Sequence, residues 1–471
     1  MSFGNFKFVQ LPFDKDGNIT AVGPIDGTHA REQLLAMAPQ IDDLIVISHG
    51  WNNDVNDAQR LYDGFFKNVR AQWNTAGLTQ RDSDRAGILA VYWPSKRFDE
   101  PGQVTGGAAA VGEAAAAEPD YQALIAAQIA NLKDEHGQFP PAQQALLDDA
   151  LAASRTLDDP AAQTAFVVAM ATLMPAPQEP DPGLDVLNVR AAQEAGPEIL
   201  QELATQLGGT TGPPADLDSG GAASIGTLAP PDLTGGAAAF NPFGNLKQAA
   251  WMLLNGTTYY VMKERAGVIG PKVTPLVLEA MAKNPTMRVQ LAGHSFGGRL
   301  VTALANALPA GGQTAATMTL LQAAYSHYGL APAPPPGAAA RPVGAFRSVV
   351  EQKKVRGLIQ ITHSNHDWAV GAGYPIASAI MRQTAAFINV PSTAGSLWGG
   401  MGANGAQQTP ESYDTDLLDG HVAYPPPPAN LPAPKRTIRN LNGNAFISGH
   451  GDITGPQVTW AFLQAFVGSR S

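Results

Sequence analysis

The chain has 471 residues and no cysteine, 44% of its residues are hydrophobic, and its formal net charge is -10. This acidic balance, without a long basic run, argues against nucleic acid or an anionic membrane surface as a partner. The absence of cysteine excludes disulfides, thiolate metal ligands and cysteine nucleophiles.

The N-terminal residues lack the basic segment, long apolar stretch and small-residue cleavage site that together mark a signal peptide. No uninterrupted apolar run reaches the ~20 residues that a membrane-spanning helix needs. We therefore expect no transmembrane segment, and a soluble protein that is cytoplasmic or released without a cleavable signal peptide.

The first hundred residues alternate between strand-like and helix-like patterns. Residues 43–48 form a continuous apolar run rich in β-branched residues, which is typical of a strand buried on both faces of a parallel sheet. Asp54 or Asn56 can cap a following helix, whose apolar residues recur at helical spacing as far as Trp73. Further strands are expected at residues 6–11 and 86–93, and a short helix at residues 28–37.

The composition changes after Arg97, where alanine, glycine, proline and glutamine become abundant. We interpret residues 101–240 as a mainly helical insertion, which can serve as a lid. Its end, residues 208–239, has the glycine and proline content of a flexible linker. Helices are expected near residues 121–133, 142–155, 161–174 and 185–207.

The rest of the chain resumes the alternation. Residues 246–282 show helical periodicity that breaks near Gly270-Pro271, whereas residues 392–434 have the composition of a long irregular surface stretch. Strands are expected at residues 288–292, 318–324, 355–362 and within 436–447, and helices from Ser295 to about 308 and at 346–354, 375–387 and 456–467. The alternation predicts an α/β fold with a mostly parallel, doubly wound sheet and long Pro/Gly-rich loops.

One turn in this pattern suggests chemistry. An apolar strand runs directly into Gly293-His294-Ser295-Phe296-Gly297, and a helix-compatible segment follows. A serine on so sharp a turn leaves no room for side chains two positions before or after it, which explains Gly293 and Gly297. The amides at the start of the helix would favour an anion at Ser295. We therefore interpret Ser295 as a nucleophile.

A serine nucleophile needs an acid and a base. Asp367 lies in the loop that follows the strand at residues 355–362, where the acid is expected, although it could also cap the next turn. His363 and His366 lie on the same loop. They are interpreted as loop residues, or as histidines that contact site residues and not the substrate. They could ligate a metal together with Asp367 only if Asp367 were not the acid, so no metal site is predicted.

His450 is the favoured base, because it follows the last expected strand and precedes the last helix. His421 is the alternative, but it lies in an irregular stretch without a strand directly before it. His294 precedes the nucleophile on its turn and would usually be a packing residue there.

Two backbone amides should bind the oxyanion. One is the amide of Phe296, directly after the nucleophile. The other is the amide of Trp51, in the loop that follows the strand at residues 43–48 and contains His49 and Gly50. Gly50 lets the backbone turn its amides inward, although His49-Gly50 could also be only a strand-ending turn.

These residues together resemble the α/β-hydrolase superfamily of serine hydrolases. The resemblance is to a poorly characterised bacterial branch, over about residues 40–97 and 246–468. Its motifs are His49-Gly50-Trp51-Asn52-Asn53, Trp93-Pro94-Ser95 and Gly293-His294-Ser295-Phe296-Gly297. The resemblance implies an α/β-hydrolase catalytic domain made of residues 1–100 and 241–471, which cleaves a carboxylic ester through an acyl-enzyme and needs no cofactor. Lids of the family often follow the strand after the elbow, whereas the insertion here precedes the helix that leads to it.

The substrate is expected to be a small-molecule or lipid-like ester. His49, Gly50, His294, Tyr325 and Trp368 are the expected pocket residues, although the aromatic ones could equally belong to the core. An amidase, peptidase or thioesterase could use the same three residues. A non-catalytic binding or assembly protein that retains the fold is the alternative from another class. The sequence does not indicate the oligomeric state.

Overall fold

The computed structural model of the protein describes residues 2–51, 53–95, 120–133, 139–174, 189–207, 242–337, 341–367, 370, 399–426 and 437–470. The helix expected at residues 375–387 and the linker at 208–239 lie outside these residues. In the described part, eight strands form one sheet in the order β1-β3-β2-β4-β5-β6-β8-β7. Every neighbouring pair is parallel. This result confirms the predicted α/β class and the parallel sheet.

The strands lie close to their predicted positions, with one addition at the edge. They are β1 (Lys7–Pro12), β2 (Asp43–Ser48), β3 (Ala86–Tyr92), β4 (Arg288–His294), β5 (Thr317–Leu321), β6 (Ile359–His363), β7 (Ser412–Asp416) and β8 (Ile438–Asn442).

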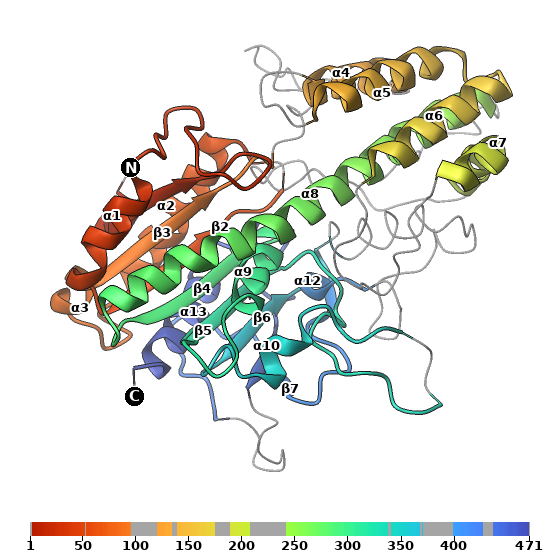
Figure 1. The fold of residues 1–471 in the computed structure, drawn as a ribbon. Coiled ribbons are helices and arrows are strands. Elements are labelled where there is room, and N and C mark those ends of the chain that lie inside the picture. The colour runs from red at the N-terminus through yellow and green to blue at the C-terminus, as the bar shows by residue number, and fades with distance from the viewer. Residues whose placement is uncertain are drawn as a thin grey trace, which may run out of the picture.

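Helices cover both faces of the sheet (Figure 1). One face carries α1 (Ala30–Met37), α8 (Pro242–Lys283) and α9 (Phe296–Asn306), and the other carries α2 (Val55–Gln72) and α13 (Pro456–Gly468). Successive strand residues point to opposite faces. Leu44 and Val46 of β2 therefore pack in the core under α8 and α9, whereas Ile45 and Ile47 pack in the core under α2 and α13. Short helices are η1 (Phe3–Asn5), η2 (Ala38–Gln40), α3 (Gln80–Asp84), α10 (Arg347–Glu351) and α12 (Met401–Asn404).

The helices expected in the insertion are present and pack against the N-terminal part of α8. They are α4 (Tyr121–Lys133), α5 (Pro141–Ala153), η3 (Ser154–Thr156), α6 (Pro160–Leu173) and α7 (Val189–Leu207). The rings of Tyr121 on α4 and Trp251 on α8 lie 6.0 Å apart. Figure 1 shows α8 running from these helices to the sheet, so one helix belongs to both parts of the molecule.

The break predicted near Gly270-Pro271 does not occur, because α8 continues through Pro271 and Pro275. Gly270 lies so close to α9 that a Cβ there would be 2.3 Å from the carbonyl oxygen of Leu300. Both prolines lie on the exposed side of the helix, where the carbonyl groups of the preceding turn can face water. The prediction of a break was wrong because tight packing on α9 outweighs the local effect of proline.

The prediction that residues 392–434 are wholly irregular was also wrong, because Ser412–Asp416 forms β7 at the edge of the sheet. This strand pairs with β8 alone. Its sequence is mostly polar, as suits an edge strand that needs little apolar surface. The segment therefore gives no hydrophobic signal.

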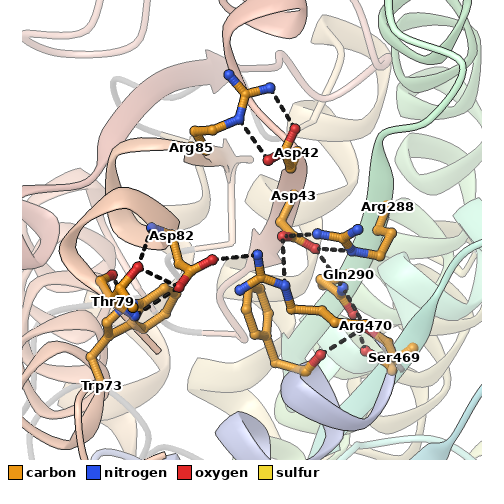
Figure 2. Close-up of polar contacts among 12 residues, drawn as sticks. Asp42, Asp43, Trp73, Thr79, Asp82, Arg85, Arg288, Gln290, Ser469 and Arg470 are labelled. Atoms are coloured by element: carbon orange, nitrogen blue, oxygen red, sulfur yellow. Dashed lines mark hydrogen bonds and ion pairs between the residues drawn. The ribbon is translucent and has the colours of Figure 1, made fainter. Parts of the chain in front are cut away.

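Ion pairs connect charged residues at the amino ends of β2 and β4 (Figure 2). Ser295 follows the carboxyl end of β4, at the other end of the sheet. The Asp43 carboxylate at the start of β2 is 1% exposed and accepts two hydrogen bonds from Arg288 of β4, at 2.8 and 2.6 Å. Arg470 lies 3.7 Å from Asp43 and donates to Asp82 at 2.6 Å. The network joins two central strands to α3 and to the end of the last helix.

Candidate active site

Ser295 occupies the single residue between β4 and α9. Its backbone has φ 55° and ψ -124°, a conformation that costs free energy for any residue with a Cβ. The turn is held because the Ser295 N–H donates to the Leu321 carbonyl at 3.0 Å, and the Ser295 carbonyl accepts from Gly298 and Ala324, each at 3.0 Å. The serine is 2% exposed. Such strain at a buried polar residue is typical of functional sites.

The glycines on either side of Ser295 are required by close packing. A Cβ on Gly293 would lie 2.2 Å from the Gly297 carbonyl oxygen, and a Cβ on Gly297 would lie 2.2 Å from the Ser48 carbonyl oxygen. Neither neighbour is the end of a flexible side chain, so no side chain fits at either position. The steric reason that the sequence suggested for this pattern therefore holds in the structure.

Asp367 and His450 form a buried hydrogen-bonded pair. The Nδ1–H of His450 donates to the Asp367 carboxylate, with distances of 2.8 and 3.0 Å to its two oxygens. Asp367 is 0% exposed, and its Oδ1 also accepts the Val370 N–H at 3.0 Å. With Nδ1 donating to Asp367, the Nε2 of neutral His450 carries a free lone pair.

His450 lies beside the Ser295 turn. The Nε2–H of His294 donates to the His450 carbonyl at 2.9 Å, and the two imidazole rings are 4.8 Å apart. Among the described residues, no hydrogen bond joins Ser295 Oγ to His450 Nε2. Catalytic hydrogen bonds are often long in unliganded proteins and tighten when substrate binds.

His294 is a structural neighbour of His450. Burial, reinforced by His450, holds the pKa of His294 well below its usual value of 6.5. The ring is therefore neutral, and its Nε2–H can hold the His450 backbone in place. This contact favours the interpretation of His294 as a packing residue over its interpretation as a substrate-pocket residue.

The loop with His49, Gly50 and Trp51 lies directly against the serine. A Cβ on Gly50 would lie 2.5 Å from the Ser295 Cβ and 3.1 Å from its Oγ. His49 fixes this loop, since its Nδ1–H donates to the Gly50 carbonyl at 2.9 Å and its Nε2 accepts the Trp93 N–H at 3.2 Å. Its ring stacks on Trp93 with centroids 5.5 Å apart. His49 therefore orients the loop that approaches Ser295.

Trp51 and Phe296 meet over the start of α9. Their ring centroids are 6.1 Å apart, and both rings contact Tyr259 of α8, at 5.5 Å from Trp51 and 4.7 Å from Phe296. The structure thus brings together the two residues whose amides were expected to bind the oxyanion.

The other predicted residues fall elsewhere. Tyr325 is buried under α9, with its hydroxyl 3.1 Å from the Thr302 hydroxyl and its ring against Phe346. His421, the alternative base, is exposed in a turn, and its ring packs 5.3 Å from Trp460 of α13. His366 is exposed and His363 is half-buried. Trp368 lies outside the described residues.

Two residues at this site had no signal in the sequence. Gln322 follows β5 with φ 44°, is fully buried, and donates from Nε2 to the carbonyls of Gly449 and His450 at 3.0 and 2.9 Å. Tyr259 reaches the site from the middle of α8. Neither has a local motif, because the long-range packing of the chain alone brings them here.

Within the described part of the chain, no three histidine or acidic side chains come together as a metal site. The same residues include no helix long and apolar enough to cross a membrane. Comparison with protein-family models, with curated proteins and with solved structures found no match for this chain.

Proposed function

We propose that this protein is a serine hydrolase of the α/β-hydrolase fold, which cleaves a carboxylic ester through an acyl-enzyme. The observation that carries the proposal is the His450–Asp367 hydrogen bond of 2.8 Å beside a serine held at φ 55° between a strand and a helix. A carboxylate that fixes the imidazole tautomer and a serine held on a strained strand-to-helix turn are what a Ser-His-Asp site requires.

In the proposed first step, Ser295 Oγ attacks the carbonyl carbon of the ester while its proton moves to His450 Nε2. The Asp367 carboxylate stabilises the imidazolium that forms. The amides of Trp51 and Phe296 donate to the oxyanion of the tetrahedral intermediate. This intermediate collapses as its bond to the alcohol oxygen breaks and His450 returns the proton to that oxygen.

In the second step, water attacks the acyl-enzyme. His450 takes one proton from the water, the carbon–Oγ bond breaks, and Ser295 recovers its proton, so that the products are an alcohol and a carboxylic acid. Ester and water supply all the atoms of the two products, so the proposed reaction needs no cofactor.

Hydrolysis of p-nitrophenyl esters tests this proposal. Replacement His450→Ala should lower kcat by roughly 10³-fold or more, because the general base is lost. The matched control is His421→Ala, which removes an exposed imidazole elsewhere on the surface and should keep kcat. Equal activity of wild type and His450→Ala, or loss only in His421→Ala, would contradict the assignment.

A further inference from the structure

Asn255 is a buried amide without a hydrogen-bond partner in the part of the chain that the structure describes. It lies in the N-terminal half of α8, is 0% exposed, and neither its Oδ1 nor its Nδ2 accepts or donates a hydrogen bond among these residues. Leaving such groups unpaired in a protein interior is costly, and native proteins rarely do so without a functional reason. The side chain can accept through Oδ1 and donate through Nδ2.

Asn255 lies one helical turn from Tyr259, which contacts two residues of the candidate active site. Residues four apart share a helix face, so Trp251, Asn255 and Tyr259 form one stripe on α8. Tyr259 contacts Trp51 and Phe296, and Phe296 directly follows Ser295. Asn255 is one turn farther along α8, about 6 Å at 1.5 Å per residue. Trp251, at the far end of the stripe, contacts Tyr121 of α4.

The described residues leave space at the position after Asn255. Gly256 is buried, yet a Cβ built on it would meet no atom of the described residues within 4 Å. Asn255 and Gly256 are consecutive, so the amide and the space that the described residues leave occur on the same turn of α8. Consecutive residues point in different directions from a helix, so a group that enters this space must bend around α8 to reach the Asn255 side chain.

The acyl side of the substrate is the part that can extend here. His450 must protonate the leaving alcohol, and it precedes α13, which covers one face of the sheet. α8 covers the other face and meets the site through Trp51 and Phe296, whose amides would bind the carbonyl oxygen. The alcohol of a bound ester then lies toward His450, which leaves the side of α8 open to the acyl chain.

We propose that Asn255 selects an acyl chain carrying a group that both donates and accepts hydrogen bonds, such as a carboxamide or a hydroxyl. This role of Asn255 rests on the proposed function. Such a group pairs with both Oδ1 and Nδ2. A plain alkyl chain excludes water from the amide and pairs with neither atom, so the site discriminates against it.

The test compares two series of p-nitrophenyl esters, with plain alkanoyl chains and with chains of equal length that end in a carboxamide. The wild type should hydrolyse the best carboxamide ester with a kcat/KM roughly tenfold or more above that of its alkanoyl partner. Replacement Asn255→Leu should reverse this preference. It should also keep or raise Tm, because an unpaired buried amide is removed.

The matched control is Thr257→Val. Thr257 is 1% exposed on the same turn, and its hydroxyl already donates to the Leu253 carbonyl at 3.0 Å. This variant should keep the wild-type selectivity. A second variant, Gly256→Leu, should lower hydrolysis of long acyl chains and spare the shortest ester, because it fills the open space.

Wild-type selectivity near one, or an unchanged ratio in Asn255→Leu, would overturn the inference even when Ser295 reacts with a fluorophosphonate probe. Failure of the probe to label the wild type would instead overturn the proposed function itself. The two failures are therefore distinguishable.

Discussion

Acid should lower the free energy of unfolding of this protein through His49, which lies in the loop that approaches Ser295. Burial lowers the pKa of His49 from 6.5 to about 4, although the hydrogen bond to the Gly50 carbonyl acts in the opposite direction. Protonation would place a proton on Nε2, which faces the Trp93 N–H at 3.2 Å. Two donors would then point at each other in a buried site.

The direction of the pH effect on stability follows from which state of the chain binds the proton. Between pH 6.5 and about 4 the unfolded chain binds a proton at this histidine and the folded chain does not, so acid favours unfolding. The contribution of His49 to stability is complete above pH 6.5 and falls as the pH drops toward 4. A shift of this size corresponds to about 3 kcal/mol.

Denaturant unfolding at a series of pH values, for the wild type and for His49→Gln, measures this contribution. The glutamine can still accept from the Trp93 N–H but does not titrate. The free energy of unfolding of the wild type should fall by about 3 kcal/mol more than that of the variant over this window. His294 contributes a loss of the same sign in both proteins, so the difference isolates His49. Parallel pH profiles for the two proteins would refute the reasoning.

Two further predictions concern opposite edges of the sheet. Gly50→Ala would place a Cβ 2.5 Å from the Ser295 Cβ. The variant should lose most ester hydrolysis, whereas its far-UV circular dichroism should stay unchanged. Full activity would contradict the close approach of this loop to Ser295. Asp43→Asn should lower the free energy of unfolding by roughly 3 kcal/mol in urea, because Arg288 loses a buried carboxylate partner. A change below about 1 kcal/mol would show that the network contributes little, as for an exposed ion pair.

The sequence predicts the central strands well because they are buried on both faces. Residues 44–47 are all apolar, and in the structure β2 spans Asp43–Ser48 around them. The sequence does not predict β7 for the converse reason, since an edge strand made mostly of polar residues carries no hydrophobic signal. The continuity of α8 was missed because its contact with α9 is formed by residues distant in sequence.

The arrangement of the candidate site was predictable where chain order and strand ends determine it. Asp367 and His450 each follow a predicted strand, and the structure places their side chains 2.8 Å apart. Gln322 and Asn255 could not be found in this way. Gln322 acts through a backbone turn and long-range carbonyl contacts, and the significance of Asn255 depends on the absence of a partner among the described residues.

The central claim is that Ser295 is a nucleophile activated by His450. Incubation of the folded protein with a fluorophosphonate probe, followed by mass spectrometry of its peptides, tests this claim most directly. The account predicts one covalent adduct, located on Ser295, which is absent in Ser295→Ala and forms far more slowly in His450→Ala. An unlabelled folded wild type, or an adduct that persists in Ser295→Ala, would contradict it.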